Sequence, residues 1–124
     1  MQSQSFKVFI NELADMSGEY IAKSFGKHHN VDYKKDASPV TEVDKNTEYM
    51  LREAIAKKFP DHGIIGEEYG NQNTDAEYVW VLDPIDGTKS FISAVPLFGT
   101  LIGLMKKGEP ILGAINQPVL RERI

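Results

Sequence analysis

The spacing of apolar residues changes once along this chain, and that change limits the folds that it can adopt. Before Pro60, apolar residues recur at three- and four-residue steps, which is the period of an amphipathic helix. After Pro60 they form short runs separated by polar turns, which is typical of strands. Helices first and strands afterwards favour an α+β layer over a doubly wound sheet, in which the two would alternate.

Two helices are expected before Pro60. The first covers about residues 5–25 and the second about residues 42–59, with Thr41 as the N-cap residue of the second. Pro60 ends the second helix, because its ring cannot continue one. The polar stretch between the helices is expected to form a loop. It contains His28 and His29, which are more often solvated side chains than metal ligands in such a context.

Short strands are expected after Pro60. Residues 63–66 form one, residues 71–77 a polar loop, and residues 78–82 a second strand, whose apolar run indicates burial on both faces. The sequence DPIDGT at residues 83–88 then predicts a tight turn.

The last part of the chain is expected to contain a short helix and a β-hairpin. The helix covers residues 89–93, and the hairpin turns at KKGE, where Gly108 can adopt positive φ. The second hairpin strand is followed closely by the last residue, Ile124. We therefore expect an open sheet edge that further chain or a partner would cover.

Composition excludes several classes of protein. The chain has 124 residues, which is enough for one compact domain. Its net charge of −4 argues against a nucleic-acid partner, and no apolar stretch approaches the length that spans a membrane. It contains no cysteine, so thiolate metal sites are excluded, and a cytoplasmic location is expected.

Two carboxylates follow the expected buried strand. Asp83 and Asp86 are three residues apart, Pro84 stiffens the segment between them, and Gly87 lets a ligand approach the backbone closely. Carboxylate oxygens suit Mg²⁺, Mn²⁺ or Ca²⁺ rather than zinc. The alternative is an ordinary Asp-Pro turn followed by an Asp-Gly corner.

Two further acidic positions could belong to the same site. Glu67, in the sequence GEE, directly follows an expected strand, although a solvated loop carboxylate would look the same. Asp44 fits the capping-box pattern with Thr41, so a structural role is at least as well supported. Together these residues indicate a divalent-metal site that could serve phosphoryl chemistry.

Three motifs resemble those of the inositol monophosphatase superfamily. They are WVLDPIDGTKSF at residues 80–91, VTEVD at residues 40–44 and GEE at residues 66–68, in the family's order. The resemblance implies a layered α/β/α/β/α sandwich, of which residues 1–124 supply the N-terminal helix pair and sheet. It also implies that a C-terminal half, with a further metal-binding aspartate in a Trp-Asp motif, belongs to the complete domain.

The resemblance implies a Mg²⁺-dependent phosphoric monoester hydrolase in which metal-activated water attacks the phosphate. Ligands of the first Mg²⁺ would be Glu67, Asp83 and the carbonyl oxygen of Ile85. Those of the second would include Asp83 and Asp86. The protein would form a homodimer and bind neither nucleic acid nor membrane.

The resemblance also implies roles around the substrate phosphate. Thr88, hydrogen-bonded to Asp44, would orient the attacking water, and Glu67 would share in catalysis. Phosphate binding is implied for Asp86, Gly87 and Thr88.

Within the superfamily, the chain is most similar to bacterial histidinol phosphatases. The similarity lies in KSFI at residues 89–92, PLFGTLI at residues 96–102 and NQP at residues 116–118, although Ala94 replaces a usual glycine. It implies hydrolysis of L-histidinol phosphate to L-histidinol and phosphate, a step of histidine biosynthesis. Inositol monophosphate or phosphoadenosine phosphate are the alternative substrates. Another alternative is an inactive fragment that only binds metal.

Overall fold

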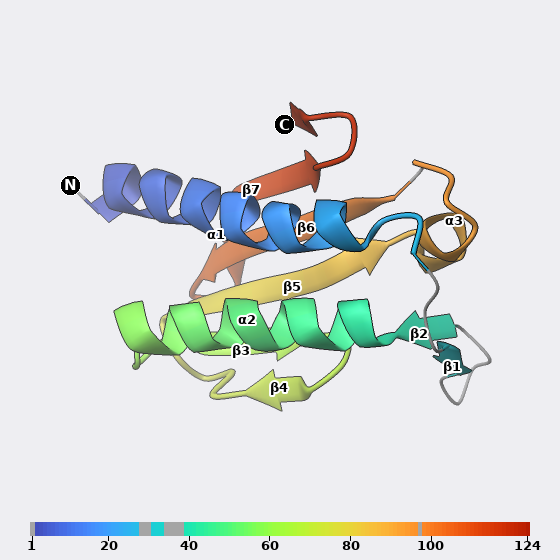
Figure 1. The fold of residues 1–124 in the computed structure, drawn as a ribbon. Helices are drawn as coiled ribbons and strands as arrows, with labels where there is room; N and C mark the ends of the chain where they lie inside the picture. The colour runs from blue at the N-terminus through green and yellow to red at the C-terminus, as the bar shows by residue number, and fades with distance from the viewer. Residues whose placement is uncertain (1, 28–30, 34–38, 97) are drawn as a thin grey trace.

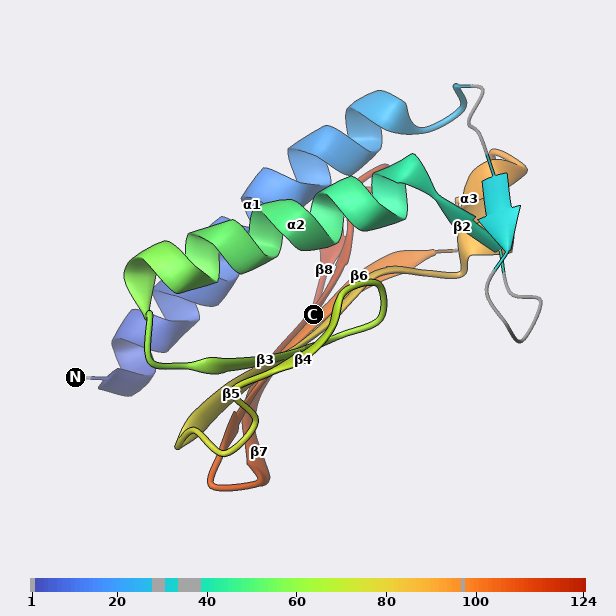
Figure 2. The ribbon, with the colours of Figure 1, turned by 90° about the horizontal axis from the view of Figure 1, so that it is seen from below.

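Two long helices lie on one face of a mixed sheet in the computed structural model, which describes residues 2–27, 31–33, 39–96 and 98–124 (Figure 1). Helices α1 (Gln2–Ser24) and α2 (Glu42–Lys58) run side by side, and both cover the same side of the sheet (Figures 1 and 2). The expected α+β layer is therefore confirmed. No helix in the described ranges is long and apolar enough to cross a membrane.

The main sheet has six strands in the order β4-β3-β5-β6-β7-β8. Strands β3 and β5 are parallel, and every other neighbouring pair is antiparallel. The strands are β3 (Gly63–Gly66), β4 (Gly70–Gln72), β5 (Tyr78–Asp86), β6 (Gly99–Lys106), β7 (Glu109–Gln117) and β8 (Glu122–Arg123). The expected hairpin is present as β6 and β7. The short helix α3 (Thr88–Ile92) follows β5.

The core fills the space between the helices and the sheet. Trp80 of β5 is fully buried, and Phe6 and Phe9 of α1 meet its ring edge to face, with ring centroids 6.4 and 5.6 Å away. Such aromatic contacts add to the free energy gained from burying apolar area. The helical spacing of apolar residues thus correctly identified the faces of α1 and α2 that pack on the sheet.

The start of α2 is fixed by the expected capping box. The Thr41 side chain accepts hydrogen bonds from the backbone N–H groups of Val43 and Asp44, and the Asp44 side chain accepts one from the backbone N–H of Thr41. Both residues are buried, so this cap is a rigid part of the interior. The cap therefore fixes the position of the Asp44 side chain at the start of α2.

Three expectations about local structure were wrong. Part of the expected loop between the helices forms two paired strands, β1 (Val31–Tyr33) and β2 (Pro39–Thr41). The expected polar loop at residues 71–77 begins with β4, which pairs with β3. The DPIDGT segment does not turn after Leu82; β5 continues to Asp86 because β6 still pairs with it there. His28 and His29 lie outside the described residues.

The end of the sheet also differs from the expectation of an open hairpin edge. The chain reverses after β7, and β8 pairs with Asn116 and Gln117. The turn is stabilised by the Gln117 side-chain oxygen, which accepts hydrogen bonds from the backbone N–H groups of Val119 and Leu120. Backbone pairing therefore covers this part of the β7 edge.

His62 gives the fold a pH dependence. Its ring stacks on Phe59 with centroids 4.5 Å apart, and its Nδ1 accepts a hydrogen bond from Trp80 Nε1 at 3.0 Å. Burial lowers the pKa of His62 from its usual 6.5, against the opposing charges of Asp61 and Glu77. The unfolded chain therefore binds a proton more readily than the folded chain does.

We expect the contribution of His62 to the free energy of unfolding to be full above pH 6.5 and to be lost as the pH falls from that value through the lowered pKa of the folded state. Urea unfolding between pH 8 and pH 5 measures this. His62→Gln, which does not titrate, should show a shallower decline over the same range. Parallel pH profiles for the two proteins would contradict the assignment to His62.

Candidate functional site

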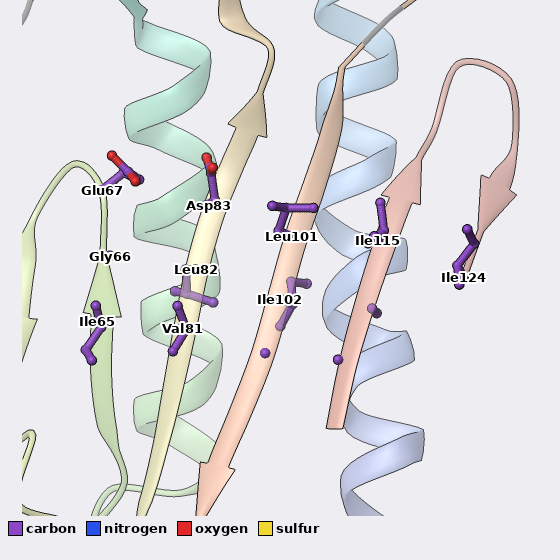
Figure 3. Close-up of a pocket in the computed structure, with 13 residues that line it drawn as sticks. Ile65, Gly66, Glu67, Val81, Leu82, Asp83, Leu101, Ile102, Ile115 and Ile124 are labelled. Carbon is purple, nitrogen blue, oxygen red and sulfur yellow. The ribbon is translucent and has the colours of Figure 1, made fainter. Parts of the chain in front are cut away.

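Glu67 and Asp83 are brought together by the parallel pairing of β3 and β5. Gly66 pairs with Leu82, so the residues that follow them, Glu67 just after β3 and Asp83 within β5, lie at about the same level of the sheet. Both side chains line one pocket of about 780 Å³ on the face that the helices leave uncovered (Figure 3). The two carboxylates predicted to share an ion thus come from neighbouring strands and face the same space.

The rest of this pocket is apolar. Its lining includes Ile65 and Val81 beside the two acids, and Leu101, Ile115 and Ile124 farther across the sheet (Figure 3). The side chains of a strand alternate between faces, so Leu82 packs in the core while Val81 faces the pocket. The expectation that residues 78–82 are buried on both faces was therefore wrong for Val81, which is only half-buried.

The end of β5 is irregular, and this shapes the DPIDGT segment. Regular pairing with β6 stops at Asp83 and resumes at Asp86, opposite Gly99. Proline has no N–H to donate to the ladder, and the carbonyl oxygen of Pro84 instead accepts a hydrogen bond of 2.7 Å from Thr100 Oγ1. Asp86 is exposed at the strand end and is not part of the pocket lining.

Thr88 joins the ends of α2, β5 and α3 in one hydrogen-bond network. Its Oγ1 lies 3.1 Å from Asp44 Oδ1 and 3.1 Å from the carbonyl oxygen of Ile85. Asp44 Oδ2 accepts further hydrogen bonds from the backbone N–H of Thr41 at 2.8 Å and from Thr41 Oγ1 at 2.7 Å. Asp44 therefore both caps α2 and contacts Thr88, so its two predicted roles are compatible.

Gly87 makes the turn from β5 into α3. Its φ of 94° is in the left-handed region, which glycine adopts without steric cost, and it occupies the N-cap position of α3. The backbone N–H groups that follow an N-cap have no acceptor within their own helix. The predicted phosphate-binding amides of Gly87 and Thr88 lie at this turn.

The predicted ligands fit Mg²⁺ by their chemistry, since all of them are hard oxygen donors. Glu67 and Asp83 share the pocket, whereas Asp86 lies at the exposed strand end. Among the described residues, no three His, Cys, Asp or Glu side chains gather closely enough to hold an ion. Each ion of the predicted pair, however, would take only two carboxylates from this chain.

Glu48 is a polar residue of this region that sequence reasoning missed. It lies in α2, is completely buried, and accepts hydrogen bonds from the backbone of the turn that follows Glu67. In the sequence it resembles any solvated helical glutamate. The one available signal is its position four residues after Asp44, on the same side of the helix.

Comparison with known proteins agrees with the three motifs. The sequence profile of the inositol monophosphatase family matches residues 2–124. The chain is 54% identical over 120 residues to the chloroplastic bifunctional phosphatase IMPL2 of Arabidopsis thaliana, covering 95% of this chain and 35% of that protein. It is 45% identical over 112 residues to a histidinol-phosphatase of Chlorobaculum parvum, covering 90% of this chain and 43% of that protein.

Solved structures agree as well. An inositol monophosphatase from Anabaena (Nostoc) superposes with a TM-score of 0.84 at 32% identity, over 99% of this chain and 44% of that one. The chain thus spans less than half the length of each of these three relatives. The chain belongs to the inositol monophosphatase family.

Proposed function

We propose that residues 1–124 supply the metal-binding half of a Mg²⁺-dependent phosphatase that hydrolyses a small phosphate monoester. The observation that carries the proposal is the parallel pairing of β3 with β5, which brings Glu67, just after β3, and Asp83, within β5, to one pocket. Glu67, Asp83 and the carbonyl of Ile85 would hold one ion, and Asp83 and Asp86 would contribute to a second. Bound Mg²⁺ supplies activation of water and neutralisation of phosphate charge.

The role proposed for Thr88 is to position the attacking water. Its single hydroxyl hydrogen is drawn mainly to Asp44, because a charged carboxylate is a stronger acceptor than the Ile85 carbonyl. The lone pairs of Thr88 Oγ1 then remain available to accept a hydrogen bond from a water molecule. Asp44 is itself held by two hydrogen bonds from Thr41, so this orientation is fixed before substrate arrives.

L-Histidinol phosphate is the substrate that we propose. Support comes from the similarity to the Chlorobaculum parvum histidinol-phosphatase and from the KSFI and PLFGTLI segments. Inositol monophosphate is the second candidate, favoured by the similarity to the Anabaena inositol monophosphatase. The residues that would contact the alcohol part of the substrate are expected mostly in a C-terminal half.

The test uses residues 1–124 followed by the part of the Chlorobaculum parvum enzyme that they do not match, which we call the completed enzyme. With Mg²⁺, its kcat/KM for L-histidinol phosphate should exceed that for inositol monophosphate and phosphoadenosine phosphate by at least about tenfold, or about 1.4 kcal/mol. A preference for either competitor would overturn the substrate. No Mg²⁺-dependent turnover of any of the three would overturn the phosphatase proposal.

Because the appended half could itself decide between these substrates, a second chimera serves as the control. It joins the N-terminal half of the Anabaena inositol monophosphatase to the same Chlorobaculum parvum segment. A stronger preference for L-histidinol phosphate in the completed enzyme than in this control would assign part of the specificity to residues 1–124. Equal preferences would assign all of it to the appended half.

A further inference from the structure

Glu48 ties the turn after β3 to helix α2. Its Oε1 accepts a hydrogen bond of 2.9 Å from the backbone N–H of Glu68, and its Oε2 accepts one of 2.9 Å from the backbone N–H of Tyr69. Arg52, one helical turn later, donates from Nε to Glu48 Oε2 at 3.0 Å and from Nη2 to the carbonyl oxygen of Gly70. Two side chains of α2 one helical turn apart thus bind Glu68 and Tyr69 of the turn and Gly70, the first residue of β4.

Little space separates Gly66, the residue before Glu67, from the side chains of Glu48 and Arg52. A Cβ atom on Gly66 would lie 2.5 Å from Glu48 Oε2 and 2.7 Å from Arg52 Nη2. Such distances would force the glutamate out of its bonds with the turn. The carboxylate of Glu48 therefore occupies the space that a side chain at position 66 would need, and it binds the backbone directly after Glu67.

Burying a glutamate carries a large free-energy penalty unless the charge is paired and hydrogen-bonded. Glu48 is 0% exposed and the Arg52 side chain only 12% exposed. Helix α2 also has a capping box and buried apolar residues that do not involve this pair. What the pair adds is a fixed position for residues 66–70.

We propose that Glu48, supported by Arg52, is a positioning residue that sets where the Glu67 carboxylate meets a divalent cation. This deepens the proposed function and rests on it, because it assumes that Glu67 is a ligand. Hydrogen-bonding partners that orient metal ligands typically change metal affinity by about 10–100-fold when they are removed. Glu48 acts on the ligand through the backbone rather than through its side chain.

Glu48→Gln is the sharpest change, because it keeps the size and shape of the side chain. An amide has one acceptor oxygen, and its NH₂ group would face a backbone N–H or Arg52, which are donors. One of the bonds to Glu68 or Tyr69 must therefore be lost. Arg52→Lys is a milder variant that keeps the charge but removes the forked contact to Glu48 and Gly70. Glu53→Gln, exposed on the same helix, is the matched control.

Residues 1–124 are tested in two ways: Mn²⁺ binding by electron paramagnetic resonance, and hydrogen exchange at the amides of Glu68 and Tyr69. We expect Glu48→Gln to weaken Mn²⁺ binding about tenfold or more and to speed exchange at these two amides. Arg52→Lys should do the same to a smaller degree, and Glu53→Gln should change neither. A role limited to stability would lower the melting temperature without moving Mn²⁺ affinity at 25 °C.

Glu67→Gln separates the two ways in which the proposal could fail. If Glu67→Gln weakens Mn²⁺ binding while Glu48→Gln and Arg52→Lys leave it unchanged, the positioning role is wrong and the metal site stands. If Glu67→Gln has no effect on Mn²⁺ binding, the metal site and the positioning role both fall. If Glu48→Gln does not fold, Arg52→Lys decides by the same criteria.

Discussion

Asp83→Asn is expected to remove nearly all turnover from the completed enzyme, with a loss in kcat of about 10³-fold or more. Asp83 is the residue that both proposed ions would share, and stabilisation by a metal ion contributes several kcal/mol to a transition state of this kind. At about 1.4 kcal/mol per factor of ten, the loss of that contribution spans several orders of magnitude. Folding should suffer less, because the change removes repulsion between two carboxylates that line one pocket.

The measurement is kcat at saturating Mg²⁺, with the melting temperature recorded beside it. Asp75→Asn is the matched control, since this aspartate is exposed in the segment between β4 and β5 and should change neither value. Near-normal turnover of Asp83→Asn at saturating Mg²⁺ would contradict the shared-ligand role. An unfolded variant would instead assign Asp83 a structural part, which the melting temperature would reveal.

The parts of the fold that the sequence predicted are those whose own apolar pattern decides their structure. One core contains apolar side chains from all of the elements that the sequence predicted, namely α1, α2, β3, β5, β6 and β7. Strand β4 carries no such pattern, because all three of its residues are exposed. It is a strand only because β3 offers it an unpaired edge, and such pairing cannot be read from three polar residues.

The candidate site also has residues that sequence could predict and residues that it could not. Glu67 and Asp83 could be placed from sequence because each directly follows a short apolar run, and the parallel pairing of β3 with β5 sets those runs side by side. The continuation of β5 to Asp86 could not, because it depends on pairing with Gly99 across the sheet. Glu48 could not either, since its burial depends on amides 20 and 21 residues away.

Thr88→Val is expected to reduce kcat of the completed enzyme by about 10²–10³-fold, a typical loss when a group that handles the reacting proton or water is removed. Valine keeps the shape of threonine but places a methyl group where the hydroxyl contacts Asp44 and Ile85. The cost in stability should be about 2–3 kcal/mol, because the buried carboxylate of Asp44 loses the hydrogen bond to its Oδ1. Thr74→Val, in an exposed loop position, is the control and should be neutral.

Asp44→Asn separates the two roles of the carboxylate. It should lower both activity and stability, because Asp44 is buried and accepts from Thr41 as well as from Thr88, and an amide cannot accept at both of its ends.

The double variant Asp44→Asn/Thr88→Val tests whether Asp44 acts on the reaction only through the Thr88 hydroxyl. If it does, the double variant should lose no more activity than the more damaging single variant, since residues that act as a unit are not additive. The stability losses should add only in part, because both substitutions remove the hydrogen bond between Thr88 and Asp44, whereas only Asp44→Asn alters the cap made with Thr41. Activity losses that multiply in the double variant would show that Asp44 and Thr88 serve catalysis independently, and the proposed orientation of Thr88 by Asp44 would be wrong.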